Sequence, residues 1–124
     1  MNLKKIRLEL ARTPEFPAGS HLHGYEFVAP LDAAGHIDAE GWKAARERCR
    51  VHRFWDGEDD LTGHLIHRPG GSWAFHYDIK AAAGSDDEAG YRFANHSFRP
   101  GDYVSIREAD DELVTFVVRA VSDV

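Results

Sequence analysis

The sequence predicts an α+β fold, either a mostly antiparallel curved sheet or a small, partly open β-barrel, with one α-helix. Three observations predict it. About seven short segments alternate apolar and polar residues with the period of a strand, at near-regular spacing. Glycine, proline and acidic residues cluster between these segments, as they do in turns. Only one segment has the spacing of a helix, so we expect a single domain over residues 1–124.

Two strands are predicted early in the chain, at Lys4–Arg12 and Tyr25–Leu31. In the first, Arg7 and Glu9 lie on the side opposite to three aliphatic residues, which is typical of a strand with one buried face. The second segment alternates in the same way. Pro30 has no backbone donor, so it places the second strand at the edge of a sheet or ends it there.

One helix is predicted over Asp38–Cys49. Asp38 can cap its first turn, and Glu40 suits the positive end of the helix dipole. Apolar positions recur with helical spacing at three residues, Trp42, Ala45 and Cys49. Because this apolar stripe is narrow, we expect the helix to lie against the sheet by one edge and to close one end of it.

The centre of the chain predicts three more strands. Val51–Trp55 is the first, and the acidic stretch Gly57–Asp60 follows it as a turn. The clearest hairpin joins Leu61–His67 to Trp73–Ile79 through Pro69–Gly71. Proline suits the second position of a type I turn, and glycine suits the left-handed position after that turn, so we expect a three-residue loop.

The last third of the chain predicts a loop and three strands. Ala81–Gly90 is small and acidic, which favours a mobile loop. Tyr91–Phe98 is predicted as a short aromatic strand, and a final hairpin pairs Tyr103–Arg107 with Leu113–Val121 around Asp110–Asp111. A set of aromatic residues follows the alternation of a core, and any member exposed at the mouth of a barrel would form a ligand site: Trp55, Trp73, Phe75, Tyr77, Tyr91, Phe93 and Phe98.

Composition narrows the class of protein. Hydrophobic residues make up 43% of the 124 residues, which supports a packed core. The formal net charge of −6 argues against a general nucleic-acid or membrane-surface binder. The first residues lack the apolar stretch of a secretory signal, and the single cysteine, Cys49, fits a reducing compartment. We therefore expect a cytoplasmic protein.

Four segments carry a family resemblance that spans nearly the whole chain: Leu8–Phe16 (LELARTPEF), His23–Pro30 (HGYEFVAP), Arg68–Asp78 (RPGGSWAFHYD) and Pro100–Glu108 (PGDYVSIRE). Together they resemble a family of small uncharacterised bacterial proteins. The resemblance implies a bacterial, single-domain protein. No activity is known for that family, so the resemblance implies no catalytic or binding residue.

Histidine is unusually frequent, with eight residues in 124, and imidazole is the commonest metal ligand. His21 and His23 form an H-x-H pair, which a strand would place on one face. In the register of a three-residue loop His64 stands opposite His76, with Cβ atoms ~5 Å apart. Two such rings could share a divalent metal such as zinc. A functional site needs a third ligand, and Asp78 or the H-x-H pair is the nearest choice.

Three other features contain residue types that can take part in binding or catalysis. The Arg46–Arg53 stretch is a candidate for holding phosphate or an RNA backbone, although cations are favoured at a helix C-terminus in any case. Cys49 lies on the apolar stripe, where we expect a buried structural thiol rather than a nucleophile. The acidic stretches Asp56–Asp60, Asp86–Glu88 and Asp110–Glu112 lack the spacing of a calcium loop and predict solvated turns.

The function expected from the sequence is a non-enzymatic binding or interaction module whose partner is a small ligand or a protein. The alternative is a metal-binding protein or metal-dependent enzyme that uses His64 and His76. A phosphate or RNA binder that uses Arg46–Arg53 comes third. The first is favoured because neither of the others shows a specific ligand signature.

Overall fold

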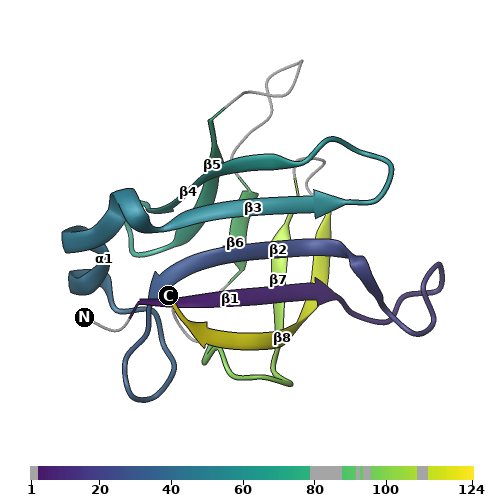
Figure 1. The fold of residues 1–124 in the computed structure, drawn as a ribbon, viewed down its shortest axis with the longest axis horizontal. Coiled ribbons are helices and arrows are strands. Elements are labelled where there is room, and N and C mark those ends of the chain that lie inside the picture. Colours follow the sequence, from purple (N-terminus) through teal and green to yellow (C-terminus); the bar gives the residue numbers. More distant parts are fainter. Residues whose placement is uncertain (1–2, 79–87, 92, 94–95, 109–111) are drawn as a thin grey trace.

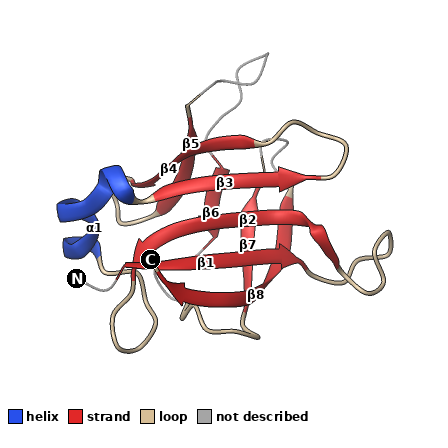
Figure 2. Ribbon diagram, in the orientation of Figure 1, coloured by secondary structure: helices blue, strands red, loops and turns tan. Residues whose placement is uncertain are grey.

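The computed structural model describes residues 3–78, 88–91, 93, 96–108 and 112–124, and its strands form a closed antiparallel barrel (Figure 1). Each strand pairs with its neighbours along the chain, and the first pairs with the last. The predicted α+β fold is confirmed, with one short helix beside the curved sheet (Figure 2). The strands are β1 (Leu3–Leu10), β2 (Ser20–Pro30), β3 (Arg50–Trp55), β4 (Leu61–His67), β5 (Trp73–Tyr77), β6 (Glu88–Tyr91), β7 (Tyr103–Arg107) and β8 (Leu113–Asp123).

The first two predicted strands are confirmed as β1 and β2, which pair along the whole of β1. Ile6 and Leu8 are fully buried on the inner side of β1, as the alternation predicts. β2 begins earlier than expected, at Ser20, and it ends at Pro30. Because the barrel is closed, Pro30 ends a strand rather than marking the edge of a sheet.

The helix α1 (Ala39–Ala45) lies at one end of the barrel (Figure 1). Its predicted cap is confirmed, because Asp38 Oδ1 accepts a hydrogen bond of 3.1 Å from the N–H of Glu40. Gly41 lets the helix approach β2 closely, since a Cβ there would lie 3.0 Å from the Cβ of Pro30. Among the described residues, no helix is long and apolar enough to span a membrane.

The predicted extension of this helix to Cys49 is wrong. The α-helix ends at Ala45, and a single 3-10 turn, η1 (Arg46–Arg48), follows it. Arg50 already pairs with His64 in the sheet, so the chain must leave the helix axis within a few residues to reach that position. Cys49 is nevertheless fully buried, as expected.

The central hairpin has the predicted register, and His64 lies opposite His76. One part of the turn differs. Gly70 has a φ of +94°, which is the value of position i+2 in a type II turn rather than a type I turn. The register is unchanged because both types bring the N–H of Gly71 to the carbonyl oxygen of Arg68, here at 3.0 Å.

β6 lies at the boundary between a predicted loop and a predicted strand, and both predictions need correction. The prediction of a loop to Gly90 is wrong for residues 88–90, and the strand predicted at Tyr91–Phe98 is wrong for residues 96–98. Gly90 pairs with Trp73 of β5 on one side and with Ile106 of β7 on the other. The rest of the predicted loop, residues 81–87, lies outside the described residues.

The predicted last hairpin is confirmed as β7 and β8, which pair from Tyr103–Val117 to Arg107–Leu113. Asp110 and Asp111 of its turn lie outside the described residues, as does Ile79, the predicted end of the central hairpin.

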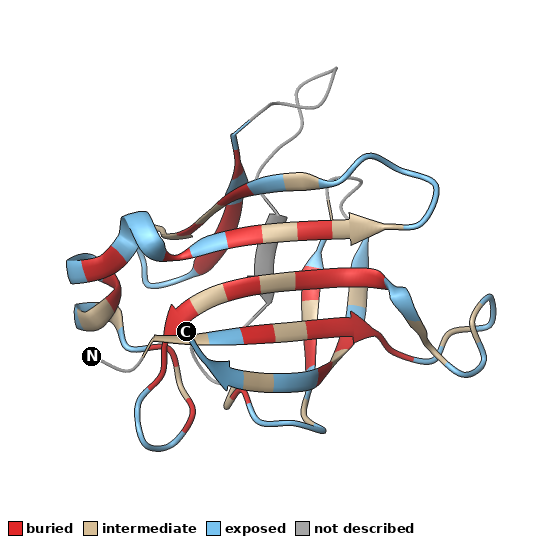
Figure 3. Cartoon of the chain, viewed as in Figure 1, coloured by how far each residue is buried: buried red, intermediate tan, exposed pale blue. Residues whose placement is uncertain are grey.

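Aromatic side chains fill the barrel, and Figure 3 shows the buried positions alternating with less buried ones along the strands. The ring of Phe75 lies 5.2 Å from the rings of both Tyr25 and Phe27. Eight strands enclose a space that side chains can just fill, so the described interior is a packed core. Of the predicted aromatic set, Trp55 is only half-buried and the side chain of Tyr91 lies outside the described residues; the others are buried, namely Trp73, Phe75, Tyr77, Phe93 and Phe98.

An apolar contact closes the end of the barrel that carries α1. Trp42 is 8% exposed and packs edge-on against Trp73, with ring centroids 5.6 Å apart. Its Nε1 donates a hydrogen bond of 2.9 Å to the carbonyl oxygen of Leu65, so the polar atom of the indole is satisfied. His67 stacks on the other ring, that of Trp73, at 4.1 Å.

An ionic network closes the opposite end. Arg53 pairs across the sheet with Tyr25, which places both side chains on the inner face. The Arg53 guanidinium contacts Glu58 at 3.0 Å and Glu108 at 3.2 Å, and Tyr25 donates to the other oxygen of Glu108. The ring of Trp55 lies 4.4 Å from the Arg53 guanidinium carbon. This network joins β2 and β3 to the residue that follows β7.

Candidate functional site

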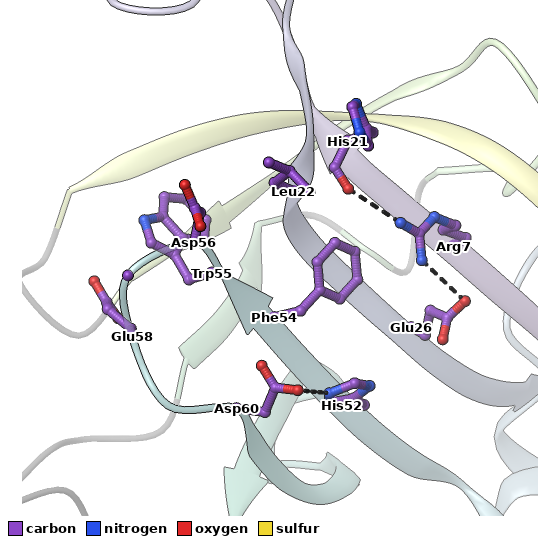
Figure 4. A pocket seen from close by; sticks show the side chains of 11 residues that line it. Arg7, His21, Leu22, Glu26, His52, Phe54, Trp55, Asp56, Glu58 and Asp60 are labelled. Carbon is purple, nitrogen blue, oxygen red and sulfur yellow. Dashed lines mark hydrogen bonds and ion pairs between the residues drawn. The ribbon is translucent and has the colours of Figure 1, made fainter.

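A cleft of about 450 Å³ opens on the outer face of β2 and β3, beside the β3–β4 turn (Figure 4). Phe54 lies at its centre, Leu22 and Asp60 flank it, and Arg7 and Glu26 form the end away from the turn. We call it the acidic cleft, for the carboxylates around it. Because the described interior of the barrel is packed, we expect a ligand to bind at the outer surface, and this cleft leaves room for one.

A bulge in β2 forms one wall of the acidic cleft. Glu9 of β1 pairs with Gly24, whereas the next residue, Leu10, pairs with Ser20, so residues 21–23 are extra in β2. Such a bulge redirects side chains. It leaves Leu22 50% exposed, and this aliphatic side chain points toward the cleft.

The floor of the cleft depends on Gly24. A Cβ at this position would lie 1.9 Å from the carbonyl oxygen of Leu8 and 3.1 Å from Cζ of Phe54. Gly24 pairs directly with Phe54 across the two strands. Phe54 can therefore lie flat over the backbone of β2, because glycine places no side chain beneath the ring.

Arg7 is held in place by several partners. Its Nε donates to Glu9 at 2.7 Å, Nη1 to Glu26 at 3.2 Å and Nη2 to the carbonyl oxygen of His21 at 3.1 Å. The guanidinium carbon lies 4.4 Å from the centroid of the Phe54 ring. Burial opposes the charge of Arg7, but the hydrogen bonds to the two carboxylates outweigh it and raise the pKa of Arg7 above its ordinary value.

Carboxylates outnumber cations around the cleft. Asp60 contacts Nε2 of His52 at 2.9 Å, and Glu58 contacts the buried Arg53. The Asp56 carboxylate makes no hydrogen bond or ion pair with a described residue and lies beside the ring of Trp55 (Figure 4). With Glu26, four carboxylates line the cleft against the single guanidinium of Arg7. The cleft is therefore electronegative.

The H-x-H pair does not share one face, because the bulge interrupts the alternation. His21 is exposed and lines the acidic cleft, whereas His23 is 6% exposed and points inward. The ring of His23 packs edge-on against Trp55 at 4.7 Å, and its Nδ1 lies 2.6 Å from Oγ of Ser20. His23 pairs with the last residue of β3, far from the other predicted metal ligands beside the first.

The structure brings together three of the predicted metal ligands, His64, His76 and Asp78, near one cation. His64 Nδ1 lies 3.5 Å from Asp78 Oδ1. Arg50 donates at 2.9 Å to Nε2 of His64 and at 2.6 Å to Asp78 Oδ2. The hydrogen bond from Arg50 lowers the pKa of Asp78, and the nearby histidines act in the same direction. Among the described residues, no group of three or more metal-ligating side chains could hold an ion.

Two of the four arginines in the Arg46–Arg53 stretch are engaged in ion pairs within the protein. Arg53 is buried in the ionic network, and Arg50 pairs with Asp78. Lys43 lies 3.7 Å from Glu40.

Burial raises the pKa of the Cys49 thiol to about 11, with a small opposing effect of Arg48. Cys49 is therefore a protonated, enclosed thiol at neutral pH, in agreement with the sequence prediction.

No family model, curated protein or solved structure matches the chain significantly. Most of the acidic cleft, including Arg7, Leu22 and Phe54, was not predicted from the sequence. Their signal lies in cross-strand register: Glu26 pairs with Arg7 on one side and with His52 on the other. The alternation within each strand identifies Arg7, Glu26 and His52 as outward-facing positions, but only the cross-strand pairing shows that these side chains are neighbours.

Proposed function

We propose that this protein is a non-enzymatic binding module whose acidic cleft receives a lysine or arginine side chain of a partner protein. The observation that carries this proposal is the excess of carboxylates around an aromatic floor. Three of the five N–H groups of Arg7 already donate to oxygens of the protein, so few of its donors are left for an approaching anion. A cation meets the carboxylates of Asp56 and Asp60 instead.

The apolar part of the cleft supports the same ligand class. Lysine and arginine bury an aliphatic stem along apolar surface while the charged head group stays at a polar rim. Phe54 and the exposed Leu22 supply the apolar surface, and Asp56 and Asp60 lie at the rim beside them (Figure 4). A simple metal cation would use only the carboxylates, and it would leave this apolar floor without a role.

Binding rather than catalysis is supported by the residue types that line the cleft. The described lining contains no serine, threonine, cysteine, lysine or tyrosine beside the His52–Asp60 pair, so that pair has no hydroxyl, thiol or amine to activate there. Cys49 lies elsewhere and is buried.

The two sequence-based alternatives have weaker support. A zinc site is supported by the direct opposition of His64 and His76, but the Arg50 guanidinium contacts both His64 and Asp78 and repels a second cation there. A phosphate or RNA site draws on the Arg46–Arg53 stretch, and the internal ion pairs of Arg50 and Arg53 already occupy two of its guanidinium groups.

The test is a titration of the protein with an acetylated, amidated pentalysine peptide, followed by amide chemical shifts in NMR spectra. We expect saturable shifts at Leu22, Phe54 and Asp60. Replacing both Asp56 and Asp60 with asparagine should weaken binding about fivefold, the size expected for two exposed ion pairs. Asp123→Asn is the matched control, since Asp123 pairs with Lys4 on the β1–β8 seam, outside the cleft.

Four results would contradict the proposal. The first is that pentalysine produces no saturable shift at these three amides, and the second is that the double variant binds as tightly as the natural sequence. Equal weakening by Asp123→Asn would show that the peptide responds only to net charge. Binding of pentaglutamate at the same amides would likewise overturn the choice of a cationic partner.

A further inference from the structure

A second pocket, of about 430 Å³, lies where α1 and η1 pack against β4 and β5. We call it the histidine pocket, because three imidazole side chains line it. It is separate from the acidic cleft, and the two share no described lining residue. Its principal lining residues are Trp42, Arg46, His64, Ile66, His67 and His76.

The walls of the histidine pocket are flat and apolar. The Nε1 of Trp42 is already bonded to Leu65, so the indole presents carbon atoms to the pocket. His67 is held by stacking on Trp73, with the two ring planes only 18° apart. Ile66 adds an aliphatic wall. Such surfaces favour the apolar body of a small ligand.

The charge at the rim of this pocket comes mainly from Arg46. Its guanidinium carbon lies 6.0 Å from the Trp42 ring, and the Arg46 side chain makes no hydrogen bond or ion pair with any described residue. Glu47 also lines the pocket and is the one carboxylate among its described lining residues. Arg46 thus offers its full set of donors to a ligand, in the fork that matches a carboxylate.

We propose that the histidine pocket binds a small organic carboxylate with an apolar body. The body lies between Trp42, Ile66 and His67, and the carboxylate accepts hydrogen bonds from Arg46 at the rim. The imidazoles of His64 and His76 line the floor. This site is independent of the acidic cleft. The two differ in charge, because carboxylates dominate the acidic cleft and the guanidinium of Arg46 lies at the rim of the histidine pocket.

The other charged groups near the pocket leave Arg46 as the donor for an anion. Arg50 of β3 donates a hydrogen bond to His64, and Asp78 beyond β5 already pairs with that arginine. From η1 the pocket also receives Arg46 and Glu47. Affinity for an anion should therefore depend on Arg46, while affinity for a neutral analogue of the same shape should not.

The experiment compares benzoate with benzamide, which has nearly the same shape and no charge. Amide shifts of Trp42, Ile66 and His67 follow each titration. Benzoate should bind more tightly than benzamide, and Arg46→Gln should weaken benzoate about fivefold without changing benzamide. Arg48→Gln is the matched control, because Arg48 belongs to the same η1 turn but does not line the pocket.

The proposal is overturned if benzoate and benzamide bind equally, or if neither gives saturable shifts at these amides. It is also overturned if Arg48→Gln weakens benzoate as much as Arg46→Gln does.

Discussion

The two ends of the barrel are closed by different chemistry. At the helix end Trp42 packs on Trp73 and its single polar atom is satisfied. At the other end Arg53 and Glu108, each with a side chain only 10% exposed, form an ion pair that Tyr25 completes. Both ends exclude water, but they do so through contacts of opposite polarity.

This difference determines how each end tolerates change. An apolar contact stabilises the fold in proportion to the surface it buries, so truncating part of a side chain removes part of that stabilisation. A buried ion pair has a different response, because removal of one partner leaves the other as an uncompensated charge. Substitutions at the helix end should therefore lower the free energy of unfolding in proportion to the side-chain volume removed. At the ionic end, stability should be lost when one partner is removed and largely kept when both are replaced.

The largest expected effect is at the helix end. Trp42→Ala should lower the free energy of unfolding by about 4 kcal/mol, because it removes a buried indole and leaves a cavity against Trp73. Trp42→Phe should recover more than half of that loss. Urea denaturation measures both, with Phe54→Ala as the control for loss of an aromatic ring on the outer face. A loss below about 1.5 kcal/mol for Trp42→Ala would show that α1 does not close the barrel.

A somewhat smaller effect is expected at the ionic end. Arg53→Met should cost about 3 kcal/mol, since Glu108 then stays buried without its guanidinium partner. Adding Glu108→Gln should cost little more, so the double variant should be far more stable than the sum of the single losses. Arg50→Met, which breaks the exposed pair with Asp78, is the control and should change stability little. Additive losses at Arg53 and Glu108 would remove the distinction between the two ends.

The third effect concerns pH at the helix end. Burial raises the pKa of Cys49 from its ordinary value of 9.0 to about 11, so the folded chain keeps a proton that the unfolded chain releases. The stabilisation is complete below about pH 9 and is lost as pH rises to about 11. Over that interval the stability advantage of the natural chain over Cys49→Ala should shrink by about 2 kcal/mol. An advantage that stays constant across this range would mean that the thiol is not enclosed.

The sequence predicted those parts of the fold that local chemistry determines. The Pro69–Gly71 turn restricts the backbone so strongly that it predicts the register of His64 and His76 correctly. The type of the turn was not predicted correctly, but the register does not depend on it. The helix cap at Asp38 was likewise readable. β6 was missed because its short segment is determined by backbone pairing to β5 and β7, which has no local sequence signal.

The candidate sites were harder to predict, because both are assembled across strands. The acidic cleft needs the β2 bulge, which brings Leu22 outward, and it needs Gly24 to lie opposite Phe54. Neither relation can be read from the alternation of one strand. One part of the histidine pocket was predicted, because the pairing of His64 with His76 was predicted correctly. The contribution of Arg46 depended on where α1 ends, which the predicted longer helix concealed.

The order of the strands also has a consequence for how the chain folds. Seven pairings in the barrel join neighbours along the chain, and each closes a comparatively short loop. The remaining seam joins β1 to β8, where Lys4 meets Asp123, 119 residues later. If that seam had to form first, it would carry the whole loop-closure entropy of the chain. Once the hairpins have assembled and curled, the same two strands are already neighbours, so barrel closure is the late step and its seam is the first to open.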